Sequence, residues 1–485
     1  MERLNKNMAE EINSSPEKIV QFGTGNFLRG FTNWMIKRLN DETFFRGRIV
    51  SMASTSSNNY KKLEEQDNLY TLYMQGLVKG KLVEEATIID TVSRTIPLNE
   101  RYNDFLQLAA VDSVEFVFSN TTEAGIVFCD EDKLQGNIKS FPAKLTEALY
   151  KRYETFNGDK TKGWTIIPCE LIENNGNVLR DFVIRYAVLW NLEESFINWI
   201  KEYNFFYNSL VDRIVPGFPT NPDEYFVKLG YRDEQLVIAE QYYIWVIEAP
   251  AALQEKLPFH SAGLNVHLVE DLTAYRESKV YYLNGAHTAM TPVALQLNES
   301  FVNQAMANPI LKKYVERLFQ EEITTLLKYD RNFLMEYGEE VIARFENPTI
   351  DHRLNGIALN ASSKWKTRNL PMFEKYMESY EKVPLLMSLG LWSWILFYRP
   401  SSKQPIQDDS EVISKMAAFW ESYERKETDA NELMANIINS GLWGHYVYSA
   451  KLANQLAQWL VTFENSGFQQ VVLEVINNEP SITNQ

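Results

Sequence analysis

The first half of the chain alternates short apolar runs with polar or glycine-rich loops. The apolar runs predict buried β-strands at residues 18–22, 48–52, 115–119 and 164–168. Between residues 31 and 39, after a glycine turn, apolar positions recur with helical spacing. Strands that end at polar loops are typical of parallel sheets, whose ligands bind beyond the carboxyl ends of the strands. The pattern therefore predicts an α/β N-terminal domain.

Residues 70–94 show a different β pattern. Strand-like runs at residues 70–74 and 85–90 flank a turn that contains glycine and lysine. We interpret this block as a β insertion in the α/β domain.

Strand signals fade after about residue 260, and helical periodicity takes over. Helices are predicted at residues 310–327, 335–345, 385–398, 412–423, 430–438 and 447–463. Pro258 and Gly263 interrupt the pattern between residues 255 and 264. We therefore predict two domains, an α/β domain over residues 1–260 and a mainly α-helical domain over residues 261–485. The loop at residues 400–405 is expected to connect two helices and not two domains.

Composition narrows the class of protein. With 485 residues the chain exceeds the usual size of one hydrophobic core, which favours at least two domains. A net charge of -16 argues against nucleic acid or an anionic membrane as a partner. An anionic small substrate would then need a local cationic pocket.

Cysteine content and hydropathy indicate a cytoplasmic protein. Cys129 and Cys169 are too few for a disulfide framework or a cysteine-based zinc site. The N-terminus lacks an apolar signal segment, and no apolar run reaches the roughly 20 residues needed to span a bilayer. The longest apolar run, at residues 385–398, is expected to be a buried helix.

A glycine turn follows the first predicted strand. Gly23-Thr24-Gly25 between a strand and a helix would let backbone N–H groups approach a pyrophosphate. Leu28 stands where the dinucleotide-binding fingerprint has its third small residue, and Gly30 comes two positions later. On the turn alone, nucleotide binding and an ordinary structural turn are both open. Arg29 could likewise contact phosphate or be a solvated helix residue.

The segment after the second strand bears on the choice of cofactor. Residues 53–57 read Ala-Ser-Thr-Ser-Ser and offer no carboxylate for the ribose hydroxyls. No arginine cluster follows that could bind a 2'-phosphate. NAD is therefore favoured over NADP.

Lys279, Asn284 and His287 place an amine, an amide and an imidazole within nine residues. In an α-helix, His287 would lie roughly 80° and Asn284 roughly 140° round from Lys279, so one face could present all three. These groups suit a metal-free proton transfer at a carbonyl, in which the ammonium donates the proton and the other two hydrogen-bond the oxygen. The alternative is a surface lysine, a capping asparagine and a core histidine.

Several motifs carry a resemblance to a known family. They are Gln21-Phe-Gly-Thr-Gly-Asn-Phe-Leu-Arg29, Phe118-Ser-Asn-Thr-Thr-Glu-Ala-Gly125, Val211-Asp-Arg-Ile214, Lys279-x4-Asn284-x2-His287, Arg344-Phe345-x-Asn347-Pro348 and Ser362-Ser363-Lys364. Together they resemble the polyol-specific long-chain dehydrogenases, the family of mannitol dehydrogenase. The resemblance implies a Rossmann-type N-terminal domain, a helical C-terminal domain, an active site in the cleft between them, and catalysis without zinc.

The resemblance also implies roles for individual residues. Lys279 would be the general acid/base, Asn284 and His287 would hold the reacting oxygen, and Asp212 and Lys364 would contact substrate. The alternative for Asp212 is a structural ion pair with Arg213. NAD would bind at the following residues: Ile19, Val20, Gln21, Phe22, Gly23, Thr24, Gly25, Asn26, Phe27, Leu28, Arg29, Gly30, Ser119, Asn120 and Thr121.

Two positions depart from the mannitol-type pattern. Glu170-Leu171 replaces Asp-Asn after the fourth strand, and Gly356 stands where that pattern has an arginine eight residues before Lys364. Both changes are expected in the substrate pocket. A substrate carboxylate would need a cation, for which the candidates are Lys364, Lys366, Arg353 and Arg368.

The segments Ile166-Ile-Pro-Cys-Glu-Leu-Ile172 and Leu283-Asn-Gly-Ala-His-Thr-Ala289 are most similar to family members that act on a hexuronate-derived keto acid. This resemblance implies NAD-dependent interconversion of D-altronate and D-tagaturonate in hexuronate breakdown. Fructuronate reductase and a mannitol-type polyol dehydrogenase are the enzyme alternatives. A non-catalytic nucleotide- or sugar-binding protein is the alternative from another class. Oligomeric state is left open.

Overall fold

The computed structural model describes residues 1–8, 14–53, 59–78, 80–121, 125–136, 138–402, 406–447 and 449–478. The chain divides into two compact units. Unit 1 comprises Met1–Gly76 and Leu82–Leu272, and unit 2 comprises Leu77–Lys81 and Thr273–Gln485.

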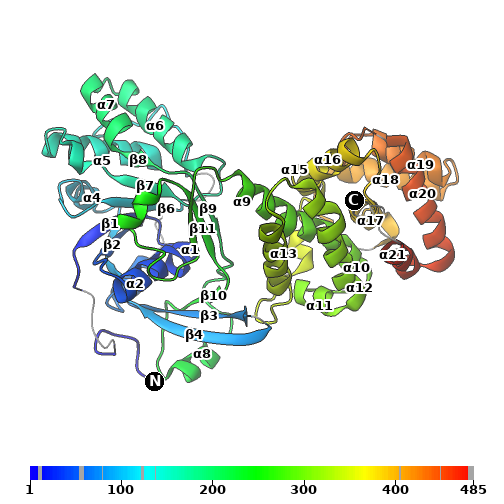
Figure 1. Cartoon of the computed structure of the whole chain (residues 1–485), viewed down its shortest axis with the longest axis horizontal. Coiled ribbons are helices and arrows are strands. Elements are labelled where there is room, and N and C mark those ends of the chain that lie inside the picture. The colour runs from blue at the N-terminus through cyan, green and yellow to red at the C-terminus, as the bar shows by residue number, and fades with distance from the viewer. Residues whose placement is uncertain are drawn as a thin grey trace. The chain divides into compact units, whose positions relative to one another are not determined.

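Unit 1 is built on a six-stranded sheet in the order β5-β2-β1-β6-β7-β8, in which every pair of neighbours is parallel (Figure 1). Its strands are β1 (Glu17–Phe22), β2 (Arg48–Ala53), β5 (Val92–Pro97), β6 (Phe116–Ser119), β7 (Thr165–Pro168) and β8 (Phe205–Phe206). In chain order this arrangement is 3-2-1-4-5-6, that of the Rossmann fold. The four strands predicted from apolar runs are confirmed as β1, β2, β6 and β7.

Both faces of this sheet are covered, which explains why its strands are mainly apolar. Ile19 points into a core with α2, and Val20 points into a second core with α5, α6 and α7. The helices of unit 1 are α1 (Asn26–Gly30), α2 (Thr32–Glu42), α3 (Asn59–Glu64), α4 (Tyr102–Leu108), α5 (Phe141–Thr155), α6 (Asn175–Leu189), α7 (Glu194–Tyr203) and α8 (Pro222–Leu229).

Two smaller sheets complete unit 1. One has the order β10-β3-β4 and the other β12-β11-β9. Their strands are β3 (Tyr70–Val78), β4 (Lys81–Ile89), β9 (Ser209–Asp212), β10 (Val237–Glu240), β11 (Ile244–Glu248) and β12 (Val266–Val269). β3 and β4 confirm the predicted β insertion, although Lys79 of its turn lies outside the described residues.

The predicted end of the insertion, at Arg94, is wrong. Val92–Pro97 forms β5, an edge strand of the parallel sheet next to β2. Ser93 and Arg94 are polar because both side chains bond the Glu17 carboxylate, with Arg94 Nε 2.9 Å from Glu17 Oε1. A strand with polar edge positions resembles an exposed hairpin in sequence, and only its pairing shows the difference.

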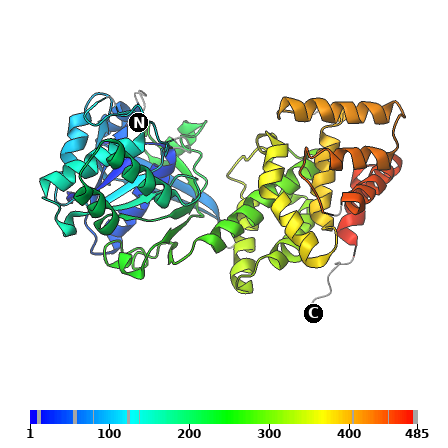
Figure 2. The same ribbon diagram turned by 90° about the horizontal axis from the view of Figure 1, so that it is seen from above.

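From Thr273 onward the described residues are mainly helical, as predicted; Figure 2 shows these helices in green to red. They are α9 (Thr273–Ser278), α10 (Ala286–Gln296), α11 (Val302–Ala307), α12 (Pro309–Arg317), α13 (Arg331–Phe345), α14 (Leu354–Ile357), α15 (Ala361–Arg368), α16 (Leu370–Tyr380), α17 (Leu385–Phe397), α18 (Ser410–Glu424), α19 (Ala430–Asn439), α20 (Ser449–Ser466) and α21 (Phe468–Asn477). α17 is buried from Leu386 to Phe397, which confirms the prediction that the longest apolar run is a core helix.

The helix predicted at residues 310–327 is confirmed as a continuous helical stretch, but it is not α-helical throughout. α12 gives way to a π-helix, η4 (Leu318–Ile323), and then to a short 3₁₀ turn, η5 (Thr324–Leu326). Glu322, within η4, accepts hydrogen bonds from the backbone N–H groups of Leu386 (2.7 Å) and Met387 (2.8 Å) at the start of α17. The irregular turn therefore contains the carboxylate that caps the central helix of the unit.

Candidate functional sites in the two units

The glycine loop of unit 1 lies where the strand order of the main sheet reverses, between β1 and β6. Phe22 and Ser119 are in register at the carboxyl ends of these strands. Beyond them, the N–H of Gly23 donates to the carbonyl of Met52 (3.1 Å) and that of Asn120 to the carbonyl of Phe22 (3.0 Å). In open parallel sheets such a reversal is the usual place for a ligand.

Each glycine of the loop has a separate role. Gly23 has a φ of +121°, and a Cβ there would lie 2.9 Å from the carbonyl oxygen of Asn120. A Cβ on Gly25 would have no atom within 4 Å, so the backbone at this position is open to a ligand. A Cβ on Gly30 would lie 2.8 Å from Val215 Cγ1, so the displaced third glycine permits close packing of α1. This loop has the shape needed for close approach of a pyrophosphate.

Arg29 is buried and hydrogen-bonded within unit 1. Its guanidinium donates to the Gln235 carbonyl (2.9 Å) and to Asn26 Oδ1 (2.8 Å). The alternative of a solvated helix residue is therefore wrong. Arg29 instead connects the loop after β1 to the segment before β10.

Most of the other predicted cofactor residues are buried under the glycine loop and hold its backbone in place. Ile19, Val20, Phe22 and Leu28 are buried in the cores. Gln21 is fully buried and donates to the Gly23 carbonyl (3.1 Å). The exposed backbone lies at Gly25 and Asn26, with Thr24 and Phe27 partly exposed.

Glu170 organises the segment that follows β6. Its carboxylate is buried and accepts from Ser119 Oγ (2.9 Å), from the Thr121 N–H (2.9 Å) and from Thr121 Oγ1 (2.8 Å). Burial raises the pKa of Glu170, although these hydrogen bonds oppose the shift. Glu170 therefore positions the Ser119–Thr121 segment, and Leu171, the other residue of the pair expected in the substrate pocket, is exposed. A glutamate directly after an apolar strand was the only available signal of this role.

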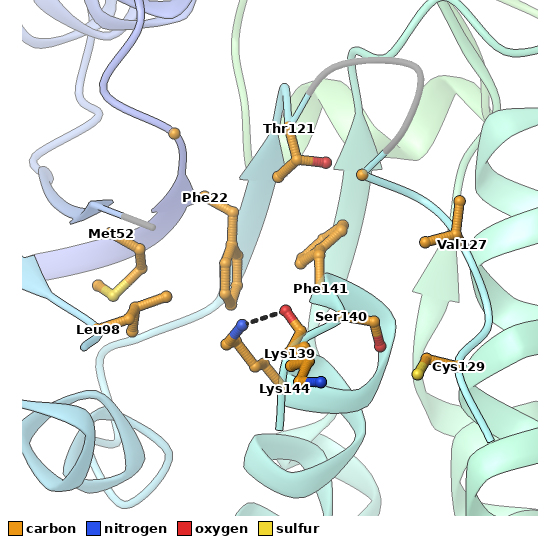
Figure 3. Close-up of a pocket in the computed structure, with 12 residues that line it drawn as sticks. Phe22, Met52, Leu98, Thr121, Val127, Cys129, Lys139, Ser140, Phe141 and Lys144 are labelled. Carbon is orange, nitrogen blue, oxygen red and sulfur yellow. Dashed lines mark hydrogen bonds between the residues drawn. The ribbon is translucent and has the colours of Figure 1, made fainter. Parts of the chain in front are cut away.

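A cavity of about 270 Å³ opens beside this loop (Figure 3). Its walls combine apolar and cationic side chains. They include Phe22, Met52, Leu98, Thr121, Val127, Cys129, Lys139, Ser140, Phe141 and Lys144. Lys144 Nζ donates to the Lys139 carbonyl, as the dashed line in Figure 3 marks. Of the residues that line this cavity, the sequence motifs contain Phe22, Gly23, Thr121 and Gly125. Ser54–Ser57, where we looked for a ribose carboxylate, and Thr122–Ala124 of the Phe118–Gly125 motif lie outside the described residues.

In unit 2, Lys279–Gly285 forms a π-helix, η3, that leads directly into α10. The α-helical arrangement predicted for Lys279, Asn284 and His287 is therefore wrong. A π-helix turns less per residue than an α-helix because its hydrogen bonds close from i to i+5. Lys279 and Asn284 are half-buried, and His287 is buried one turn into the continuing helix.

Long-range contacts hold this irregular helix. The carbonyl of Gly285 accepts from Asn369 Nδ2 (3.0 Å) and that of Asn284 accepts from Thr288 Oγ1 (2.9 Å). The Thr288 carbonyl accepts from Trp394 Nε1 (2.9 Å), because Pro292, four residues later, has no N–H to offer. Backbone groups that leave the regular ladder are thus satisfied by side chains.

His287 is the best-defined side chain of this region. Its ring stacks on Phe345 (centroids 4.1 Å apart) and meets His352 edge-on (4.9 Å). The side chain is 8% exposed, and Nε2 is buried without a hydrogen-bond partner within the part of the chain that the structure describes. Burial, followed by the charges of His352, Arg344 and Arg368, holds the pKa of His287 well below its usual value. The imidazole is therefore neutral at physiological pH.

Basic side chains surround the two histidines. Arg344 and Arg368 act electrostatically on His287, and Arg344 and Lys364 act on His352. Arg368 Nη1 donates to Thr288 Oγ1 (3.3 Å), next to His287. A protein with a net charge of -16 thus gathers three cations within one region. Burial lowers the pKa of Lys364, and the nearby charge of Arg368 lowers it further, because a like charge disfavours the protonated form.

Asp408 fixes the start of α15, the helix that contains Lys364 and Arg368. Its carboxylate accepts from the Ser362 N–H (2.8 Å), from Ser362 Oγ (2.9 Å) and from the hydroxyl of Tyr398. Burial opposes ionisation of Asp408, but the hydrogen bonds from Tyr398 and Ser362 lower its pKa overall. No sequence motif contained Asp408 or His352, and Arg344 belonged to a family motif without an assigned role.

The remaining predicted substrate residues divide between the units. Asp212 ends β9 in unit 1 and is buried, while Arg213 donates to the Gly30 and Glu240 carbonyls. In unit 2, Arg353, Gly356 and Lys366 are exposed. The structure brings His287, Lys364 and Arg368 into one region around His352 and Thr288, and Lys279 and Asn284 lie in the π-helix that leads into His287.

The described helices are each too short or too polar to span a lipid bilayer. Among the described residues, no group of three or more His, Cys, Asp or Glu side chains is placed to hold a metal ion. Cys129 and Cys169 are both free thiols.

The sequence matches two family models over most of its length. The Mannitol dehydrogenase Rossmann domain matches residues 17–261, and the Mannitol dehydrogenase C-terminal domain matches residues 271–462. The chain therefore belongs to the mannitol dehydrogenase family, which confirms the resemblance found in its motifs.

Two relatives within the family are both named for one particular activity. An altronate oxidoreductase of Bacillus subtilis (strain 168) is 44% identical over 476 residues, which are 97% of this chain and 98% of that protein. An altronate oxidoreductase of Yersinia enterocolitica is 38% identical over 95% of this chain and 97% of its own length.

Two solved structures share the fold at low sequence identity. A D-sorbitol dehydrogenase in substrate-free form has a TM-score of 0.78 at 19% identity, over 97% of this chain and 100% of that one. Pseudomonas fluorescens mannitol 2-dehydrogenase, in a ternary complex with NAD and D-mannitol, has a TM-score of 0.68 at 20% identity, over 98% and 100%.

Proposed function

We propose that this protein is an NAD-dependent oxidoreductase that interconverts D-altronate and D-tagaturonate in hexuronate breakdown. The family membership and the two altronate oxidoreductases, 44% and 38% identical over nearly the full chain, support this assignment. Two free cysteines fit a reducing compartment, and we include the cytoplasm in the proposal.

The cofactor part of the proposal rests on the glycine loop of unit 1. The open position at Gly25 leaves room for a pyrophosphate against the backbone, and the Ser119–Thr121 segment is fixed by Glu170 beside it. The adjoining cavity, with Phe22, Met52 and Leu98 in its wall, suits a flat apolar base. Bound at these residues, NADH supplies the hydride for reduction of the substrate ketone.

The acid/base part belongs to unit 2. Reduction of a ketone leaves an alkoxide that needs a proton, and Lys279 Nζ donates it to that oxygen. The Asn284 amide and the His287 imidazole donate hydrogen bonds to the same atom and so stabilise its developing negative charge. In the oxidative direction Lys279 accepts the hydroxyl proton of D-altronate. Lys364 contacts the substrate away from the reacting carbon.

The state of His287 is the observation that best supports catalysis over passive binding. A buried imidazole with a free Nε2 costs free energy when nothing occupies the position opposite it. A binding protein with a structural histidine would be expected to satisfy that nitrogen internally. A neutral imidazole can donate to an oxyanion through Nε2 without adding a second cation beside Lys279.

A screen of NADH oxidation tests the reaction, the cofactor and the substrate together. D-Tagaturonate, D-fructuronate, D-fructose and D-mannose would each be offered with NADH and then with NADPH, and D-altronate with NAD in the reverse direction. We expect the highest kcat/KM with D-tagaturonate and NADH. A higher value with D-fructuronate would indicate a fructuronate reductase, and one with D-fructose a mannitol-type enzyme. No turnover with any substrate would leave a binding protein as the better assignment.

A further inference from the structure

Arg368 is a half-buried cation without an acidic partner. It ends α15, and its guanidinium donates one hydrogen bond, from Nη1 to Thr288 Oγ1 at 3.3 Å. Across the described ranges, no carboxylate forms an ion pair with it. By contrast, Arg317 in the same unit is similarly enclosed and pairs with both oxygens of Glu321 (2.5 and 2.7 Å).

An unpaired guanidinium in this position costs free energy. Burying a charge is unfavourable unless an opposite charge or a full set of hydrogen bonds compensates it. Arg368 has five N–H donors, of which the contact with Thr288 uses one. Burial is the sole cause of its lowered pKa, with no acidic group acting in the other direction. The remaining donors form a fork that matches the two oxygens of a carboxylate.

We propose that Arg368 binds the carboxylate of the substrate and thereby determines the preference for a uronate over a neutral sugar. The proposal deepens the proposed function and rests on it. It adds to the altronate assignment the residue that distinguishes a terminal COO⁻ from a terminal CH₂OH.

The neighbouring cations are less suited to this role. Lys364 Nζ already donates to the Ile357 carbonyl (2.9 Å) and is stabilised by the charge of Asp408. Arg344 is 8% exposed and already takes part in another interaction. Lys366 and Arg353, the other two candidates from the sequence, are exposed. Arg368 alone combines partial burial, contact with the helix that bears His287, and a charge without an ion pair.

The position of Arg368 along α15 also fits the substrate. Lys364 and Arg368 are four residues apart and therefore lie on one face of the helix. Thr288, which Arg368 contacts, directly follows His287 in α10. The proposed carboxylate partner and the proposed oxyanion partner therefore belong to one region of unit 2, where a single substrate molecule can contact both.

The test compares substrates that differ in charge. D-Tagatose has a CH₂OH group where D-tagaturonate has its carboxylate. We expect Arg368→Gln to raise KM for D-tagaturonate about 100-fold, with kcat changed less than about 5-fold, because a charge-assisted bidentate contact is lost. kcat/KM for D-tagatose is expected to stay within about 3-fold. Arg368→Lys, which keeps the charge and loses the fork, should recover about 10-fold of the loss.

Arg331→Gln is the matched control. Arg331 lies exposed at the start of α13 in the same unit, and the substitution removes the same charge. KM for both substrates is expected to match the wild type. If Arg331→Gln raised KM as much as Arg368→Gln, the loss of one positive charge from the unit would explain the effect. The assignment of the substrate carboxylate to Arg368 would then fail.

The remaining outcomes separate this inference from the proposed function. If the wild type reduces D-tagaturonate and Arg368→Gln keeps the preference for it over D-tagatose, the inference is wrong and the function stands. Equal losses with both sugars would also overturn it, because the role would not be specific to the carboxylate. If the wild type does not turn over any keto acid, the proposed function itself fails, and the inference with it. Circular dichroism and NADH binding of each variant identify a folding defect, in which case Arg368→Lys decides.

Discussion

The glycine loop of unit 1 and the π-helix region of unit 2 satisfy their polar groups in different ways. In the loop, the polar side chains form hydrogen bonds within the loop and with the segment after β6. Arg29 bonds Asn26, Gln21 bonds the Gly23 carbonyl, and Glu170 bonds Ser119 and Thr121. What remains open is backbone, at Gly25. In the π-helix region of unit 2, side chains bond the backbone carbonyls of Gly285 and Thr288. The groups that lack hydrogen-bond partners there belong to side chains, namely His287 Nε2 and most of the Arg368 guanidinium.

This difference matches the demands of the two proposed ligands. A pyrophosphate is common to every dinucleotide and can be bound by backbone N–H groups in a fixed shape. A sugar acid must be recognised and chemically changed, which needs a proton donor and charges of defined position. Substitutions in the loop should therefore act through shape and stability, and those near the π-helix through charge and catalysis.

Removing Lys279 should give the largest effect and act on catalysis alone. We expect Lys279→Ala to lower kcat for D-tagaturonate reduction by about 10³-fold or more, since the alkoxide then lacks its proton donor. NADH affinity, measured by fluorescence titration, is expected to stay within about 2-fold because the glycine loop belongs to the other unit. Turnover similar to the wild type would remove the proposed role of Lys279.

Two alanine substitutions in the loop should separate an effect on folding stability from an effect on NADH binding. Gly23→Ala would force a side chain into a φ of +121° and within 2.9 Å of the Asn120 carbonyl, which should cost about 2–4 kcal/mol of unfolding free energy. Gly25→Ala, at a φ of -68° with open space around it, should change stability by less than about 0.5 kcal/mol. It should still weaken NADH binding about 10-fold by blocking close approach.

Urea unfolding and NADH titration of both variants provide the measurements. The contrast fails if Gly25→Ala destabilises the protein as much as Gly23→Ala, or if Gly25→Ala binds NADH normally.

Asp408→Asn should affect the unit 2 site indirectly. Loss of the charged acceptor for Ser362 and Tyr398 is expected to cost about 1–2 kcal/mol and to loosen the start of α15. KM for D-tagaturonate should then rise about 10-fold while KM for NADH is unchanged. Asp409→Asn is the control, because Asp409 caps α18 through Glu411 and not α15. A rise in KM with both variants would show that α15 does not mediate the effect.

The smallest predicted effect is a dependence of stability on pH. The pKa of His287 in the folded protein is well below its usual value, so below about pH 6.5 the unfolded chain takes up a proton that the folded protein does not. Stability from this residue is therefore complete above pH 6.5 and decreases as the pH falls. The expected loss is about 1.4 kcal/mol per pH unit while that difference persists.

His287→Asn isolates this contribution. Urea unfolding followed by tryptophan fluorescence at pH 7.5, 6.5 and 5.5 should show a shallower loss in the variant than in the wild type. Burial raises the pKa of Glu322 to about 7, so the contribution of this residue to stability increases as the pH falls. Because Glu322 is present in both proteins, its contribution cancels when the variant is compared with the wild type. Equal slopes would contradict a neutral His287.

Local sequence patterns predicted the parts of the fold that depend on local burial. Apolar runs identified β1, β2, β6 and β7 to within a residue or so at each end, because strands buried on both faces are mainly apolar. The glycine spacing likewise predicted the loop after β1. The pattern failed at β5, where Ser93 and Arg94 are polar because they contact Glu17.

Composition and motifs by themselves thus determined an α/β domain followed by a helical domain, the family, and the candidate proton-transfer residues. Only the tertiary structure decided how those residues are presented. Asn369 bonds the end of the π-helix at Lys279–Gly285, Trp394 bonds the start of α10, and the surroundings of His287 include Phe345, His352 and Arg368. These contacts join segments some 60 to 110 residues apart, so no local periodicity could have indicated them. Hydrophobic burial is encoded locally, whereas hydrogen-bond and charge partners are fixed only when distant helices pack.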